Sequence, residues 1–515
     1  MYKNEKLLVG KNSKKEVYLL PNMANRHGLI TGASGSGKTI TLKVLAESFS
    51  EAGIPVFLVD VKGDLAGTAF PGVMNENIEK RVNNLNLEGF ELKKYPVTFY
   101  DVYGKNGHPI RATVKGVGPR LLSKMLDLTD TQEEILGVVF KISEDEKYDL
   151  INLDNLDYML AYVNERRQEY SSKYGNISTQ SITSIKRAVI NLMDNGGDLF
   201  FGEPSFDIKD FRKYDEETGY GYINILDAQS LFKDPTTYTI LLLWLLTTVY
   251  NEMDEVGDLP KPRLVFFIDE AHLIFSEMKP NYIKQLTQIV KLIRSKGVGL
   301  YFISQSPSDI TDEILSQLGN RVQHVLRSYT KTDEKAIMAA ANSFRKNSEF
   351  DTAEAIRLLG TGEALVSFQT EKGEPDIVEK VTILPPQSRM GTISDSERQE
   401  IIKKSRLYGK YEKRVDSKNV KLESKKEEKE EIKETRVDSS EELTAQERLR
   451  RYNEAKKAKV EEPIEVTPTK LEKKVTPTKY KKKTAAQKLE NKVVNKTVNK
   501  ATTKIVNYVF NKILK

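Results

Sequence analysis

A glycine-rich stretch near the start of the sequence carries the first residues that could do chemistry. Residues 32–39 read GASGSGKT, which matches the pattern G-x-x-x-x-G-K-[ST] of a phosphate-binding loop. In such a loop, backbone N–H groups surround the phosphates of a nucleotide, and the dipole of the following helix favours their negative charge. We therefore predict a site for ATP. It comprises Gly32, Ala33, Ser34, Gly35, Ser36, Gly37, Lys38, Thr39 and Ile40.

Two side chains of this loop have distinct predicted roles. Lys38 should reach the β and γ phosphates, and the Thr39 hydroxyl should bind Mg²⁺. An apolar strand, GLIT, precedes the loop and a helical pattern, ITLKVLAESF, follows it. The alternative, a glycine turn without a ligand, is disfavoured by this order of strand, loop and helix. The loop by itself does not separate a motor from a kinase.

An acidic pair follows a second buried strand, in the run LVFFIDEAH that begins at Leu264. Asp269 is predicted to hold the Mg²⁺ shell, and Glu270 to polarise the attacking water as general base. The alternative is an ordinary helix start, because Asp and Glu are common in a first helical turn. The phosphate-binding loop makes hydrolysis the favoured interpretation, since a kinase must exclude water.

The run GLYFIS ends at Ser304 and Gln305. We predict that the Gln305 amide lies beside the γ phosphate and senses it, although a polar residue at a strand end is often only part of a loop. The run ending at Asp60 continues with VKGD, and we expect its charged groups near the same edge of the sheet. No step of the reaction is assigned to them.

The elements that must position these residues alternate regularly. From residue 28 to about 386, short apolar runs alternate with helical patterns, which predicts an α/β fold: a RecA-like P-loop ATPase core with a mainly parallel sheet. A polar helical stretch predicts a helical insertion at about 118–206 in a domain spanning 1–390. The predicted strands begin at Gly28, Ile54, Val97, Tyr222, Leu264, Gly299, His324 and Ala364.

Composition excludes several classes of protein. The chain contains no cysteine, so it has no disulfide, thiolate metal site or thiol nucleophile. The longest apolar run, at 239–250, is shorter than the roughly 20 residues that cross a bilayer, so it predicts a buried helix. The N-terminus lacks the features of a secretory signal. We expect a cytoplasmic protein.

The C-terminal part has a different composition. Residues 391–482 are rich in Lys and Glu, which predicts a charged linker, helical or disordered. Residues 483–515 space their apolar residues by three and four among lysines, which predicts a basic amphipathic helix. Such a helix is compatible with binding to the DNA backbone, to an acidic membrane or to a partner helix.

Longer motifs surround the catalytic pattern and resemble one family. The chain looks similar to the bacterial HerA-like helicase family of the HerA/FtsK superfamily over about residues 5 to 390. The motifs that carry this resemblance are GLITGASGSGKT, FLVDVKGDLAG, YPVTFYDVYGKNGHPIR, LLSKMLDLTDTQEEIL, LVFFIDEAHLIF, IRSKGVGLYFISQSP and LGNRVQHVLRSYTKTDEKAI.

The resemblance implies a homo-hexameric ring that translocates or unwinds DNA, with a nuclease or another protein as a further partner. It also implies ATP between subunits and an arginine that reaches in from the neighbour. Arg321 and Arg327 match the region where such arginines fall, and Arg294 is a weaker candidate; the alternative for each is an ordinary salt bridge. We expect the chain to depart from the archaeal pattern, because the phosphate-binding loop begins at Gly32 and leaves no room for an N-terminal β-barrel.

The sequence is compatible with two functions. The first is an ATP-driven DNA translocase or helicase-like motor. The second is a P-loop ATPase that remodels a protein partner with the same ring and without DNA. Small-molecule kinases and ABC ATPases are weaker readings, since neither explains the arginines that follow the Gln305 strand.

Overall fold

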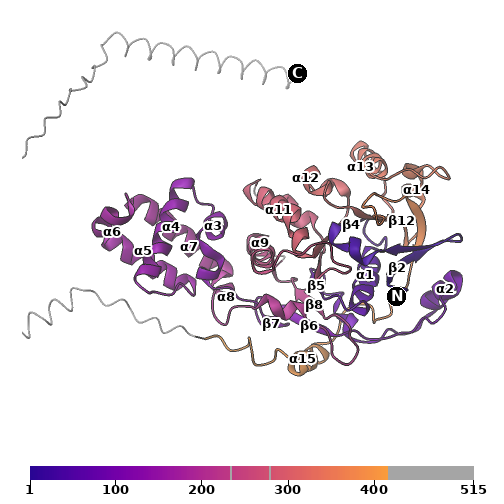
Figure 1. Ribbon diagram of the computed structural model, residues 1–515, viewed down its shortest axis with the longest axis horizontal. Coiled ribbons are helices and arrows are strands. Elements are labelled where there is room, and N and C mark those ends of the chain that lie inside the picture. Colours follow the sequence, from indigo (N-terminus) through magenta and orange to yellow (C-terminus); the bar gives the residue numbers. More distant parts are fainter. Residues whose placement is uncertain (232–234, 278–279, 416–515) are drawn as a thin grey trace, which may run out of the picture. The chain divides into compact units, whose positions relative to one another are not determined.

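One large sheet organises the protein. The computed structural model describes residues 1–231, 235–277 and 280–415 (Figure 1). Within these residues the strand order is β1-β2-β13-β12-β11-β4-β10-β9-β5-β8-β6-β7, and β3 pairs with β2. The strands from β11 to β7 in this order run parallel, whereas β1, β2, β3, β12 and β13 pair antiparallel. The predicted α/β fold class with a mainly parallel sheet is confirmed.

The strands are short and mostly buried. Their bounds are β1 Tyr2–Lys3, β2 Lys6–Lys11, β3 Glu16–Leu19, β4 Gly28–Thr31, β5 Val56–Asp60, β6 Val97–Asp101, β7 His108–Pro109, β8 Ile223–Asp227, β9 Leu264–Ile268, β10 Val298–Ser304, β11 Asn320–Gln323, β12 Glu363–Ser367 and β13 Glu379–Ile383.

The helices fall into those that cover the sheet and those inserted between β7 and β8. Their bounds are α1 Lys38–Glu51, α2 Glu76–Leu85, α3 Val114–Met125, α4 Asp130–Asp145, α5 Leu153–Glu165, α6 Arg167–Tyr174, α7 Thr179–Leu192, α8 Asp198–Phe200, α9 Pro235–Glu252, α10 His272–Glu277, α11 Pro280–Leu292, α12 Asp312–Leu315, α13 Lys331–Asn342, α14 Thr352–Leu358 and α15 Asp395–Lys404.

One predicted strand is wrong. The run HVLRS was expected to form a strand from His324, but β11 ends at Gln323. The neighbouring strand β12 begins at Glu363. The backbone carbonyl of Glu363 accepts a hydrogen bond from the His324 ring at 2.8 Å instead of from a backbone N–H group. The ladder between β11 and β12 therefore stops one residue earlier.

Alternating side chains of the central strands build two separate cores. On β9, Leu264, Phe266 and Ile268 belong to the core that includes α9 and α11. Val265 and Phe267 belong to the core on the opposite face, which includes α1. Strands buried on both faces are typical of a parallel sheet between layers of helices, and they account for the continuous apolar runs in the sequence.

The apolar run at 239–250 lies within α9, whose side chains from Tyr238 to Leu246 are almost fully buried, as predicted. In the described parts of the chain, no helix is long and apolar enough to cross a membrane.

The start of the predicted charged linker packs against the body of the protein. Helix α15 lies below β6 and β7 in Figure 1, and Ile402, Leu407 and Tyr411 are buried. These few apolar residues are not apparent in the average composition of 391–482. They suffice to pack the segment against the body because a polar network also holds it there. The rest of the linker and the predicted helix at 483–515 lie outside the described residues.

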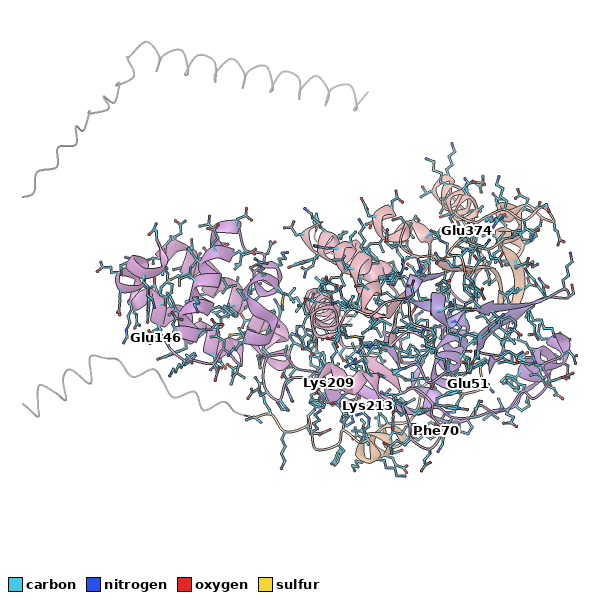
Figure 2. The ribbon with its side chains drawn as sticks, in the orientation of Figure 1. Glu51, Phe70, Glu146, Lys209, Lys213 and Glu374 are labelled. Atoms are coloured by element: carbon cyan, nitrogen blue, oxygen red, sulfur yellow. The ribbon has the colours of Figure 1, made fainter. Side chains whose placement is uncertain are left out.

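Asp210 is the centre of that network. Its carboxylate accepts hydrogen bonds from Lys410 Nζ at 2.7 Å and from Tyr411 OH at 2.7 Å, and it lies 3.2 Å from Arg406 Nη1. Figure 2 labels Lys209, which lies in the same turn as Asp210, and Lys213, which follows that turn. Burial opposes ionisation, but the hydrogen bonds from Lys410 and Tyr411 outweigh it and lower the pKa of Asp210.

We expect Asp210→Asn to lower the free energy of unfolding by about 1–3 kcal/mol, because three donors lose their charged acceptor. The wild-type contribution should be present at neutral pH and lost as the pH falls below the ordinary aspartate pKa. Urea denaturation at neutral pH and again below the ordinary aspartate pKa, together with hydrogen exchange of residues 405–415, measures both effects. Glu217→Gln, an exposed substitution nearby, serves as the control. Unchanged exchange in this segment would contradict the prediction.

Candidate active site

The loop between β4 and α1 has the geometry that binds phosphate. Gly32 and Gly37 have φ angles of +155° and +113°, which residues other than glycine rarely adopt. A Cβ atom at Gly32 would lie 2.5 Å from His324 Cβ, and one at Gly37 would lie 3.2 Å from the Gly362 backbone. His324 and Gly362 therefore pack closely against the loop and fix its backbone, as a phosphate-binding loop requires.

His324 supports the loop, a role that the sequence did not indicate. The ring is buried between two elements: Nδ1 donates to the Glu363 carbonyl at 2.8 Å, and Nε2 accepts from the Thr41 hydroxyl at 2.8 Å. Burial lowers the pKa of His324 to about 4, so the ring is neutral at pH 7 and keeps one donor and one acceptor nitrogen. It joins β11, β12 and α1 directly beneath Gly32.

Lys38 lies inside the loop at the N-terminus of α1. Its ammonium group donates to the carbonyls of Gly32 at 2.6 Å and Ala33 at 3.1 Å. Burial lowers the pKa of Lys38, and the carboxylates of Glu270 and Asp269 act against this shift. The charge is thus enclosed by the loop and faced by the acidic pair.

The acidic pair reaches the loop because three strands end at one edge of the sheet. On β10, Ser304 pairs with Thr31 of β4, and Phe302 pairs with Ile268 of β9. Asp269 and Glu270 follow β9 directly and are both buried. The Asp269 carboxylate accepts the Glu270 N–H at 2.9 Å, which fixes its orientation.

Glu270 is held in an uncommon conformation. Its φ angle is +49°, which is costly for a residue other than glycine and is frequent at functional sites. One carboxylate oxygen forms an ion pair with Lys62 Nζ. The other lies 3.2 Å from His272 Nδ1, without the geometry of a hydrogen bond. Burial opposes the charge of Lys62, but the bond to Glu270 outweighs it and raises the pKa of Lys62.

The expectation that the VKGD run lies at this edge is confirmed by the Lys62–Glu270 pair. Asp60 is used structurally, since its carboxylate accepts N–H groups of Gly63 at 2.7 Å and Leu65 at 3.1 Å. Burial raises the pKa of Asp60 to about 6. Asp64 is half-buried, and Coulombic interactions link it to Glu270 and Lys62.

Gln305 follows β10 and is exposed, one residue beyond the pairing of Ser304 with Thr31. The backbone therefore carries it alongside Gly32, the first residue of the loop. Its role as a sensor of the γ phosphate remains a prediction.

The arginines occupy different environments. Arg321 is engaged within its own chain, where its guanidinium donates to the carbonyls of Leu318 at 3.1 Å and Leu315 at 3.0 Å. Arg327 is exposed, two residues after the Val325 carbonyl that binds the Ala33 N–H at 2.8 Å. Arg294 lies 3.8 Å from the exposed Asp258. Of these three arginines, Arg327 alone is exposed, and it lies two residues from the backbone contact between Val325 and the loop.

The residues present fit a magnesium nucleotide. Ser36 Oγ is buried at the loop without a hydrogen-bond partner in the described part of the protein, and a Cβ at Gly35 would meet open space. The described residues contain no group of three or more His, Asp or Glu side chains able to hold a metal. A hydroxyl from Thr39 and a carboxylate from Asp269 suit Mg²⁺, which usually takes its other oxygens from phosphates and water.

Comparison with known proteins places the chain in a family. The family model described as "Helicase HerA-like C-terminal" matches residues 5–514. The chain belongs to this family. The resemblance to HerA-like helicases drawn from the motifs is thus confirmed.

Among curated proteins, the chain is similar to the DNA double-strand break repair helicases HerA of Sulfurisphaera tokodaii and Saccharolobus solfataricus. It is 26% identical to the first over 69% of this chain and 64% of that protein, and 24% identical to the second over 70% and 64%. The chain therefore spans less than two thirds of the length of these HerA relatives.

Solved structures that match the chain include the bacterial conjugative coupling protein TrwB, at 14% identity and a TM-score of 0.47, covering 74% of this chain and 89% of that one. VirB4 of Thermoanaerobacter pseudethanolicus has 16% identity and a TM-score of 0.47, covering 74% and 97%.

The buried charge of the acidic pair leads to a stability prediction. Burial and the neighbouring Glu270 raise the pKa of Asp269 to about 7. Between about pH 4 and pH 7 the unfolded chain has therefore lost a proton that the folded chain keeps, so stability falls as the pH rises through this range.

We expect Asp269→Asn to remove this penalty and to raise the free energy of unfolding by about 1–3 kcal/mol at pH 8, with little change at pH 4. Urea denaturation without nucleotide or Mg²⁺ at both pH values measures the difference. Glu217→Gln provides the exposed control. A variant that is less stable than the wild type at pH 8 would overturn the assignment of a raised pKa.

Proposed function

We propose that the protein is an ATP-hydrolysing ring motor that translocates or unwinds DNA. The carrying observation is that β4, β9 and β10 end together, so that Lys38, the pair Asp269–Glu270 and Gln305 share one edge of the sheet. This set combines a phosphate cradle, a ligand for Mg²⁺, a base for water and an amide at the γ position.

The residues of this edge divide the proposed reaction among them. Lys38 binds the β and γ phosphates, while Thr39 and Asp269 hold Mg²⁺, which when bound neutralises charge on the phosphates. Glu270 accepts the proton of the attacking water at Oε2, the oxygen that is not paired with Lys62. Gln305 lies next to the γ phosphate and responds to its loss.

DNA as the substrate is supported by family membership and by the relatives' names, DNA double-strand break repair helicases. The homo-hexameric ring as the active form is what the resemblance to HerA-like helicases implies. A nuclease or another protein partner is a further part of this proposal. The alternative function is remodelling of a protein partner without DNA. Measuring ATP turnover with and without DNA distinguishes the two functions.

We expect Glu270→Gln to lower ATP turnover by about 10²–10⁴-fold, because an amide does not accept the proton of water at neutral pH. ATP binding should persist, whereas Lys38→Ala should abolish it. Turnover with and without double-stranded and single-stranded DNA, together with nucleotide binding by calorimetry, measures these effects.

In the wild type, DNA should stimulate hydrolysis. ATP turnover that is indifferent to every DNA tested, together with recovery of protein but no nucleic acid by the Glu270→Gln form, would favour the protein-remodelling function. Lys331→Ala, an exposed substitution outside the site, serves as the control and should have wild-type ATP turnover.

Arg327 is proposed to complete the site of the neighbouring subunit, because its side chain is exposed whereas Arg321 is occupied by carbonyls of its own chain. Arg327→Ala should lower turnover by about 10³-fold while nucleotide binding is retained. Mixing it with Lys38→Ala subunits should restore part of the activity, since the second variant still supplies the arginine. Failure to complement under conditions where mixed rings form would reject a role in trans.

A further inference from the structure

The loop that follows β5 presents a lysine to the proposed catalytic base. Lys62 Nζ forms an ion pair with Oε1 of Glu270, and the Lys62 side chain is 50% exposed whereas that of Glu270 is 7% exposed. In the described part of the protein, Oε2 of Glu270 is buried and has no hydrogen-bond partner. The carboxylate therefore has one oxygen that is occupied and one that is free.

Two neighbouring strand ends hold the backbone of this loop. Asp60 of β5 lies opposite Asp227 of β8. The Asp60 carboxylate accepts the Gly63 N–H at 2.7 Å. The Asp227 carboxylate accepts the side-chain amide of Gln229 at 3.2 Å. A Cβ atom at Gly63, where φ is +78°, would lie 2.5 Å from that same amide nitrogen. The residue after Lys62 is therefore fixed against both strand ends, and the point from which the lysine side chain extends is fixed with it.

The acidic pair has one basic partner at this edge of the sheet. Asp269 and Glu270 are buried side by side, where two like charges oppose each other. Lys38 lies nearby, but its ammonium group donates to carbonyls of the phosphate loop. Among the residues that the structure describes, Lys62 is the one lysine or arginine in an ion pair with either carboxylate. Its ammonium group is thus the donor that orients the Glu270 side chain.

We propose that Lys62 is a positioning residue for the catalytic base. Its ammonium group holds Oε1 of Glu270, which leaves Oε2 to take the proton of the attacking water. The water oxygen forms a bond to the γ phosphorus, the bond from that phosphorus to the departing ADP breaks, and the proton goes to Oε2. Lys62 itself takes no proton. The inference rests on the proposed function, because it concerns the residue that accepts the proton there.

The test removes the ammonium group and keeps the rest of the side chain. Lys62→Met retains an apolar stem of similar length, whereas Lys62→Arg retains a charged donor for the carboxylate. Lys115→Met is the matched control, since Lys115 on α3 forms a similar ion pair at 3.4 Å with the exposed Asp149. Steady-state ATP turnover by the full chain, with Mg²⁺ and double-stranded DNA, gives kcat and KM separately. Calorimetry gives the affinity for ATP.

Lys62→Met should lower kcat by about 10²-fold, because a base displaced by about 1 Å loses this much. The affinity for ATP should change less than about threefold, since the ammonium group acts on Glu270 and makes no contact with the nucleotide in this role. Lys62→Arg should recover kcat to within about tenfold of the wild type, and Lys115→Met should match the wild type.

A double variant separates positioning through Glu270 from a general effect on the fold. When Lys62→Met is added to Glu270→Gln, the remaining turnover should fall by less than about threefold, because both substitutions remove the same action. A further loss of about 10²-fold in the double variant would show that Lys62 acts on another group and would overturn the inference.

Unchanged or faster turnover by Lys62→Met would also overturn it, since a faster enzyme would mean that the lysine restrains the base. Lys62→Arg gives the second reading if the methionine variant does not fold, and an arginine variant with no recovered turnover would count against the positioning role. Absence of ATP hydrolysis by the wild type would instead refute the proposed function.

Discussion

The parallel hydrogen-bond ladder from β9 through β10 to β4 is the constraint on which the site depends. Parallel strands in register bring their carboxyl ends to the same edge, and here the ladder pairs Ser304 with Thr31 and Phe302 with Ile268. Lys38, the acidic pair and Gln305 all follow one of these strands, whereas Arg327 follows β11, which pairs with the other side of β4. A slip of one residue in either pairing would separate the phosphate loop from the acidic pair.

This arrangement carries an energetic cost in the free protein. Asp269 and Glu270 are both buried, and the raised pKa of Asp269 records the difficulty of ionising it there. The left-handed backbone of Glu270 adds local strain. Lys62 offsets part of the negative charge through its ion pair with Glu270. Burial of the apolar strands on either side stabilises the fold enough to offset the remaining cost of the buried acidic pair.

The phosphate loop is also linked mechanically to distant parts of the chain. Helix α1 holds His324 at its first turn through Thr41, and further along it fastens the segment 385–391 through Glu47 and Lys43. That segment leads to α15, where Arg389 pairs with Glu397 at 2.9 Å, and then to the contacts with Asp210. One helix therefore contacts both the support of the phosphate loop and the segment that leads to α15.

The sequence by itself determined the features whose residues are contiguous: the glycine loop between a strand and a helix, the Asp269–Glu270 pair after a buried strand, and the alternation of elements typical of a parallel sheet. Such patterns are readable because local backbone geometry and burial depend on neighbours along the chain. Only the tertiary structure decided that β11 stops before His324, that Lys62 pairs with Glu270, and that α1 contacts the segment 385–391. These contacts join positions up to hundreds of residues apart, and no local spacing specifies which of them meet.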